Sequence, residues 1–82
     1  MKNEAVLERQ LKLIGEKLAE LRRKKGYSSH ESFAYDFELP RVQYWRMEKG
    51  KSNITIKSLL RIMEIHSLSL KEFFNSLPKE NT

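Results

Sequence analysis

The segment ELPRVQYWRMEKG, residues 38–50, places arginine, glutamine, valine and tryptophan side chains close together behind a proline. If the segment is helical from Pro40 to Lys49, at about 100° per residue, Tyr44 and Met47 fall on one side. The opposite side and its flanks carry Arg41, Val42, Gln43, Trp45, Arg46 and Lys49. Arginine bonds guanine O6 and N7, glutamine pairs with adenine, and an apolar group meets a thymine methyl. These residue types therefore suit a groove of DNA.

The same pattern has a plainer interpretation. The polar side chains could form a solvated helix face, with Trp45 packed under the first helix or against a second subunit. Helical spacing alone favours neither interpretation.

Composition limits the classes of protein that fit. The 82 residues make one domain. The formal charge of +5 suggests a nucleic acid partner, although an acidic protein partner or simple solubility would also fit. There is no cysteine, which fits a reducing cytoplasm and leaves no thiolate for a metal. No apolar run approaches the roughly 18 residues of a membrane span, and no signal-peptide core opens the chain. We therefore expect a cytoplasmic protein without membrane association.

Helical periodicity dominates the chain. A first helix is expected from about residue 3 or 4 to Lys25, followed by Gly26. Its apolar face repeats at spacings of four and three: Leu7, Leu11, Ile14, Leu18 and Leu21. Ser28 and Glu31 have the spacing of a capping box for a short second helix that ends before Pro40.

Three more helices follow. Pro40 opens the third, which Gly50 closes, and Thr55 caps the fourth. Ser69 and Glu72 form a capping box for a short fifth helix. The sequence thus predicts an all-α fold.

Five pieces of the chain, in order, resemble the Cro/phage-repressor type of helix-turn-helix domain, the XRE family. They are LRRKKG, SHESFA, RMEKG, KSNITIKSLLRI and LSLKEFF, within residues 13–74. The resemblance implies a five-helix, lambda-repressor-like fold with an extended first helix. It divides the chain into an N-terminal extension (1–12), a DNA-binding domain (13–76) and a flexible tail (77–82).

The chain departs from the family pattern at three places. Glu38 and Ser67 stand where the family usually has glycine, and one extra residue lies between Gly26 and Ala34. A left-handed conformation costs a non-glycine residue roughly 1–2 kcal/mol, so we expect the turn at Glu38 to be built differently.

The resemblance assigns roles to residues. The N-terminal end of the third helix points into the major groove in this family, which makes Arg41, Val42, Gln43 and Arg46 the base-reading candidates. The candidates for the DNA backbone are Ser29, His30, Lys49, Lys51 and Asn53. Trp45 joins them, because its ring can cover a sugar-phosphate wall while its N–H donates to a phosphate. His30 could instead be an exposed polar residue of the first turn, and any one of the lysines could be merely solvated. The family pattern also pairs Glu48 with Arg22 as a structural ion pair.

The predicted function is a sequence-specific regulator of transcription that binds double-stranded DNA as a homodimer. The alternative is a protein-interaction module of the same fold, antitoxin-like or a co-regulator, with DNA binding secondary. Leu7 and Leu11 would either form the dimer contact or pack on Phe73 or Phe74 of the same chain. No enzyme, metal or cofactor is predicted, because neither His30 nor His66 belongs to a catalytic or metal-binding pattern, and we expect His66 to cap the fourth helix.

Overall fold

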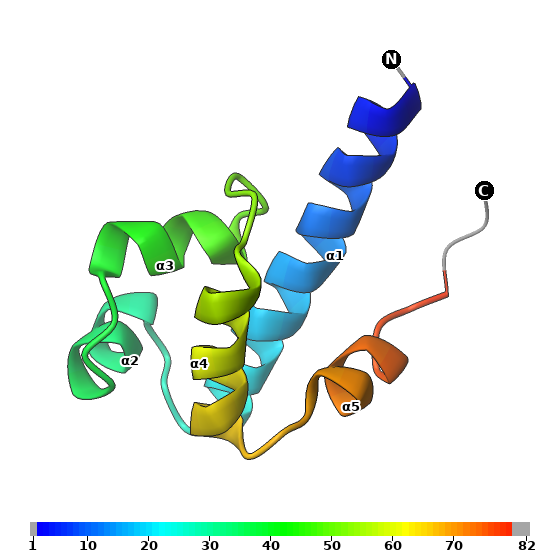
Figure 1. Ribbon diagram of the computed structural model, residues 1–82. Coiled ribbons are helices and arrows are strands. Elements are labelled where there is room, and N and C mark those ends of the chain that lie inside the picture. Colours follow the sequence, from blue (N-terminus) through cyan, green and yellow to red (C-terminus); the bar gives the residue numbers. More distant parts are fainter. Residues whose placement is uncertain (1, 80–82) are drawn as a thin grey trace.

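Five helices make up the computed structural model, which describes residues 2–79. They are α1 (Lys2–Lys24), α2 (His30–Asp36), α3 (Arg41–Glu48), α4 (Ile56–His66) and α5 (Leu70–Asn75). In Figure 1, α2 and α3 lie to the left of α4, and α5 lies to its right. The predicted all-α architecture and the order of its five helices are confirmed. Of the tail expected at 77–82, residues 80–82 lie outside the described residues.

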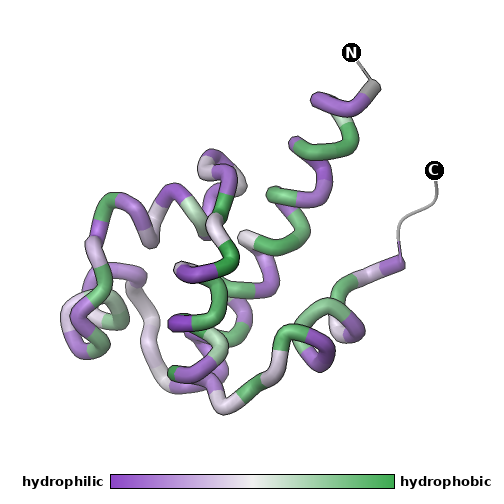
Figure 2. The backbone as a smooth tube through the Cα atoms, viewed as in Figure 1, coloured by the Kyte–Doolittle hydropathy of each residue, from purple (hydrophilic) through white to green (hydrophobic). Residues whose placement is uncertain are grey.

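The core draws on all five helices. Apolar residues recur between polar ones along each helix in Figure 2, which is the pattern of amphipathic helices around a shared interior. The buried apolar side chains are Leu18, Phe33, Ala34, Tyr44, Met47, Leu59, Ile62, Met63 and Phe73. Within residues 2–79, no helix is long and apolar enough to cross a membrane.

A glycine inside α1 sets the distance between α1 and α3. A Cβ atom on Gly15 would lie 2.4 Å from the Glu48 carbonyl oxygen and 2.5 Å from that of Met47. Real Cβ atoms do not approach backbone this closely, so the end of α3 reaches α1 only because residue 15 has no side chain. Glycine in a helix interior is otherwise unfavourable by about 1 kcal/mol relative to alanine.

Three helices begin with side-chain caps. Ser29, and not Ser28, caps α2, because its backbone is extended and its Oγ accepts a hydrogen bond from the Ser32 N–H at 3.1 Å. The prediction of a Ser28–Glu31 capping box was wrong by one residue. Thr55 caps α4, and Ser69 forms the predicted capping box with Glu72, so these two predictions are confirmed.

The turns at Glu38 and Ser67 both use left-handed backbone, each with φ of 55°. After α2, the Leu39 N–H donates to the Ala34 carbonyl at 2.8 Å. After α4, the Leu68 N–H donates to the Met63 carbonyl at 3.0 Å. Both bonds close the same type of helix end that glycine usually forms. The expectation of a different turn at Glu38 was therefore wrong: the chain keeps the turn and accepts its conformational cost.

The N-terminal part of α1 projects beyond the rest of the molecule (Figure 1). Within residues 2–79, Leu7 is 44% exposed, whereas Phe73 is fully buried. Much of the Leu7 side chain is therefore open to solvent, and the assignment of Leu7 and Leu11 to a dimer contact or to Phe73 or Phe74 stays a prediction.

Candidate nucleic-acid interface

Helix α3 has one face in the core and one face in solvent. Tyr44, Met47 and Glu48 are buried. The opposite face exposes all four residues predicted to read bases: Arg41, Val42, Gln43 and Arg46. The division agrees with the helical projection of the sequence.

Both ends of α3 are fixed by backbone geometry. Pro40 is the N-cap residue, with φ of −62° and no side-chain hydrogen bond. At the other end Gly50 has φ of 70°, and the Lys51 N–H donates to the Arg46 carbonyl at 2.9 Å. A Cβ on Gly50 would lie 2.9 Å from the Lys12 Cα, so this turn packs closely on α1. The exposed face of α3 is thereby held at a defined angle to α1.

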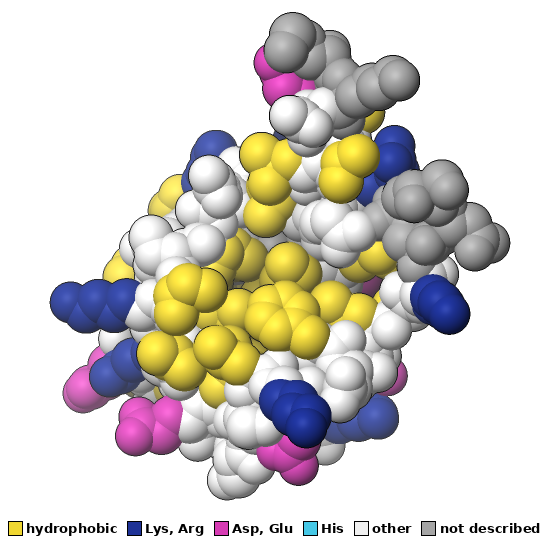
Figure 3. All heavy atoms as spheres, turned by 45° about the vertical axis from the view of Figure 1, so that its right-hand side comes forward, with side chains coloured by type: hydrophobic (Ala, Val, Ile, Leu, Met, Phe, Trp, Pro, Cys, Tyr) yellow, Lys and Arg dark blue, Asp and Glu magenta, His cyan; other side chains and the backbone are white. Residues whose placement is uncertain are grey.

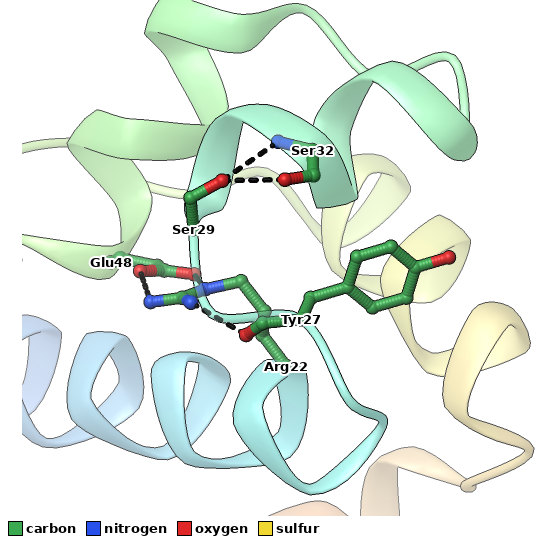
Figure 4. A network of polar contacts seen from close by, with 5 residues as sticks. All are labelled: Arg22, Tyr27, Ser29, Ser32 and Glu48. Carbon is green, nitrogen blue, oxygen red and sulfur yellow. Dashed lines mark hydrogen bonds and ion pairs between the residues drawn. The ribbon is translucent and has the colours of Figure 1, made fainter.

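A buried ion pair joins the ends of α1 and α3 (Figure 4). Arg22 Nε donates to one Glu48 carboxylate oxygen at 2.8 Å and Nη2 donates to the other at 3.1 Å. Arg22 Nη1 donates to the Tyr27 carbonyl at 2.9 Å, which extends the network to the loop before α2. The bond to Glu48 raises the pKa of Arg22, and burial raises the pKa of the neighbouring Tyr44, which stays protonated. The pair that the family pattern indicates thus lies in the core, away from the exposed face of α3.

At the N-terminal end of α3, four side chains surround a notch of about 160 Å3: His30, Arg41, Val42 and Trp45. The His30 and Trp45 rings lie 6.5 Å apart between centroids and are tilted by 50°. Ser29 adjoins this group, with its Oγ accepting the capping bond of α2. Arg41 Nη1 lies 3.8 Å from a Glu31 carboxylate oxygen in an exposed pair.

At the C-terminal end of α3, Arg46 reaches into the following loop. Its Nη2 donates to the Lys51 carbonyl at 2.7 Å. Lys49, Lys51 and Asn53 are exposed around the same turn. With the exception of Gln43, the predicted DNA-binding residues therefore gather in two groups, one at each end of the exposed face of α3.

Gln43 lies apart from both groups. It lines a second cavity of about 170 Å3 between α3 and α4, whose wall includes Lys57 and Arg61. The Arg61 Nη2 donates to the Phe37 carbonyl at 3.0 Å, so it closes the end of α2. Lys57 is an exposed cation beside α3 that the sequence analysis missed. Lys57 lies in the first turn of the helix that follows α3, and this position in the sequence could have indicated it.

His66 packs as an aromatic ring and not as a free helix cap. It stacks on Phe33 with ring centroids 5.4 Å apart and planes within 6° of parallel. Its Nε2 is buried and, among the described residues, has no hydrogen-bond partner. Burial, with the nearby Lys25 charge, lowers the pKa of His66. The expectation of a cap missed this contact, which joins α4 to α2.

Comparison with known proteins identifies relatives in two groups of control proteins. Control protein C.MunI from a Mycoplasma species is 38% identical over 67 residues, which covers 82% of this chain and 90% of that protein. The plasmid copy control protein CopR from Streptococcus agalactiae is 36% identical over 62 residues, which covers 76% of this chain and 65% of CopR. No protein-family model matches the chain.

A solved structure has the same fold. The crystal structure of the restriction-modification controller protein C.AhdI from Aeromonas hydrophila superposes with a TM-score of 0.69 and 29% sequence identity. The match covers 79% of this chain and 97% of that one. The chain therefore belongs to the Cro/phage-repressor-type, or XRE, family of helix-turn-helix regulators, which act on transcription by binding DNA.

Proposed function

We propose that this protein controls transcription as a homodimer that inserts the exposed face of α3 into the major groove of each half-site. Arg41, Val42, Gln43 and Arg46 contact base edges. One observation carries this proposal. The side chains with base-reading chemistry are exposed on α3, whereas the opposite face of this helix is fixed in the core.

The flanks of α3 supply contacts to the DNA backbone. Ser29 and His30 lie at the start of α2, and Trp45 extends that side of the surface. Lys49, Lys51 and Asn53 follow the other end of α3. Contacts on both sides of a groove set the position and orientation of a recognition helix, while the base contacts set the sequence.

A homodimer is supported by an uncovered apolar surface. Figure 3 shows apolar side chains gathered over one face and along the projecting part of α1. The large apolar side chains exposed on α1, α4 and α5 are Val6, Leu7, Ile56, Leu60 and Phe74. We place the dimer contact on this surface, with the extension at residues 1–12 contributing to it beside the domain at 13–76. A symmetric dimer would match two half-sites about one helical turn apart.

The relatives indicate the biological class of control. C.AhdI is a restriction-modification controller, and CopR controls plasmid copy number. We propose that this chain belongs to the first of these two classes, because the match covers 97% of C.AhdI but only 65% of CopR.

Selection of bound sequences from a random duplex library tests DNA recognition. We expect one enriched, roughly palindromic site. Its affinity should fall steeply with salt, because each neutralised phosphate contributes a slope of about −0.9 to log K against log salt. Lys49→Ala should reduce this slope by about 1 and weaken all duplexes alike. Absence of an enriched sequence, together with tight binding to a protein, would instead favour the interaction-module alternative.

Sedimentation equilibrium tests the dimer. Phe74→Ser should shift the protein towards monomer at micromolar concentration. Tyr35→Ser is the matched control, because Tyr35 is an 85% exposed aromatic residue on α2, outside the proposed contact. Equal association of the two variants would contradict the proposed dimer surface.

A further inference from the structure

We infer that the notch between α2 and α3 binds the C5-methyl group of a pyrimidine base, next to the base that Arg41 contacts. The inference rests on the proposed docking of α3 in the major groove. It adds a base contact to the backbone contacts proposed for His30 and Trp45, and it names the group that Val42 reads.

The shape of the notch suits a small apolar group. Its volume of about 160 Å3 leaves room for a methyl group and the adjoining ring edge. The His30 and Trp45 rings are tilted by 50° to each other, with 6.5 Å between their centroids, and Val42 lines the notch beside them. Trp45 is half-buried, so this wall is in place before DNA binds.

The position of the notch fixes what it meets. Val42 is 62% exposed and follows Arg41 directly, on the face of α3 that we place in the groove. In the major groove only a C5-methyl pyrimidine presents an apolar group, while the other base edges present donors or acceptors. Thymine carries this methyl in ordinary DNA, and 5-methylcytosine carries it in methylated DNA. Either base would place its methyl against Val42 and Trp45.

Arg41 couples the methyl contact to the neighbouring base pair. Its guanidinium lies 3.8 Å from the Glu31 carboxylate, and both side chains are mostly exposed. Exposed pairs of this kind are weak, so Glu31 can hold the guanidinium at the mouth of the notch without preventing it from bonding a base. Residues 41 and 42 therefore read two adjacent base pairs, one by hydrogen bonds and one by its methyl group.

The test uses the site selected from the random library. Each thymine is replaced in turn by deoxyuridine, which removes only the methyl group. For the wild-type chain we expect one position per half-site where affinity falls about fourfold, the value for one buried methyl group. At that position, cytosine should bind more weakly than 5-methylcytosine by a similar factor, which separates the methyl contribution from the rest of the base.

Two variants assign the effect to the notch. Trp45→Ala removes a wall, and Val42→Ser replaces an apolar lining at an exposed position where the fold is not at risk. Both should bring the thymine-to-deoxyuridine affinity ratio close to one. Tyr35→Ala, which truncates an aromatic side chain outside the notch, should keep the fourfold ratio.

The outcomes separate this inference from the proposed function. If the wild-type chain prefers its selected site over random duplexes but tolerates deoxyuridine at every position, the methyl site is wrong and groove docking stands. A methyl effect that persists in both notch variants also overturns the assignment. If no duplex sequence is preferred, the proposed function fails and this inference fails with it.

Discussion

The side chains on the two faces of α3 differ in their contacts: those on the inner face are held in the core, whereas those on the outer face make few, exposed contacts. On the inner face, Glu48 accepts two hydrogen bonds from Arg22, and the backbone of Met47 lies against Gly15. On the outer face, Arg41 has one exposed ion pair and Arg46 one bond to a loop carbonyl. The inner face of this eight-residue helix thus serves folding, and the proposed role of its outer face is DNA recognition. Substitutions on the inner face should change folding, and those on the outer face should change DNA recognition.

Breaking the ion pair should have the largest effect on the inner face. Glu48→Ala leaves the buried Arg22 charge without its carboxylate, so we expect a loss of about 3–5 kcal/mol in the free energy of unfolding. Denaturant unfolding measures the loss, and DNA affinity per folded molecule should change far less. A double-mutant cycle with Arg22→Ala serves as the control. Independent, additive effects of the two substitutions would show that the pair does not act as a unit.

Crowding the helix crossing should have the next largest effect. Gly15→Ala would place a Cβ 2.4 Å from the Glu48 carbonyl oxygen, so α1 and α3 must separate. Overpacking of this kind costs about 1–3 kcal/mol, which we expect to exceed the gain of about 1 kcal/mol from alanine's helix propensity. Thermal unfolding measures the net loss, with the exposed Glu16→Ala as a neutral neighbour. A more stable Gly15→Ala protein would mean that the two helices do not cross this closely.

Removing the backbone strain at Glu38, in the turn before α3, should stabilise the protein. Glu38 has φ of 55°, and glycine adopts this conformation without steric cost. We expect Glu38→Gly to raise the free energy of unfolding by about 0.5–1 kcal/mol, which is the left-handed cost less the extra chain entropy of glycine. Glu38→Ala separates charge from conformation, since alanine retains the strain. If alanine stabilises as much as glycine does, the gain comes from the removed charge.

We expect the smallest effect from pH. His66 has a lowered pKa in the folded protein, so between its folded value and the usual value of 6.5 the unfolded chain binds more protons. The stability is fully present above pH 6.5 and declines as pH falls through this window. Denaturant unfolding at several pH values measures the slope, and His66→Phe should flatten it. The flattening follows because phenylalanine binds no proton, and the retained ring contact with Phe33 only preserves the packing. An unchanged slope in that variant would assign the effect to other groups.

The sequence predicted the parts of this molecule that depend on local pattern. Helix order, the inner and outer faces of α3, and the caps at Thr55 and Ser69 all follow from spacing of three and four residues or from capping chemistry. The role of Gly15 was not predicted, because its need for a bare Cα arises only where α3 crosses α1. A glycine inside an otherwise apolar helix face is the pattern that should have suggested a close crossing.

The errors have the same origin. Glu38 and Ser67 adopt left-handed backbone because tertiary packing and the closing hydrogen bonds outweigh their local preference. His66 was treated as a cap because its partner, Phe33, lies 33 residues earlier in the chain. The notch at His30 and Trp45 also joins residues of two helices. Single-helix projections do not show such sites.

The most direct test of the division between faces compares Arg41→Ala with wild type on two duplexes, the selected site and a random sequence. The division predicts that affinity for the selected site falls roughly 5- to 150-fold, equivalent to about 1–3 kcal/mol, with a much smaller loss on random DNA. It also predicts that the free energy of unfolding changes by no more than about 0.5 kcal/mol. Equal weakening on both duplexes would show that Arg41 contacts only phosphate. A loss of affinity that merely follows a loss of folded protein would contradict the separation of the two faces.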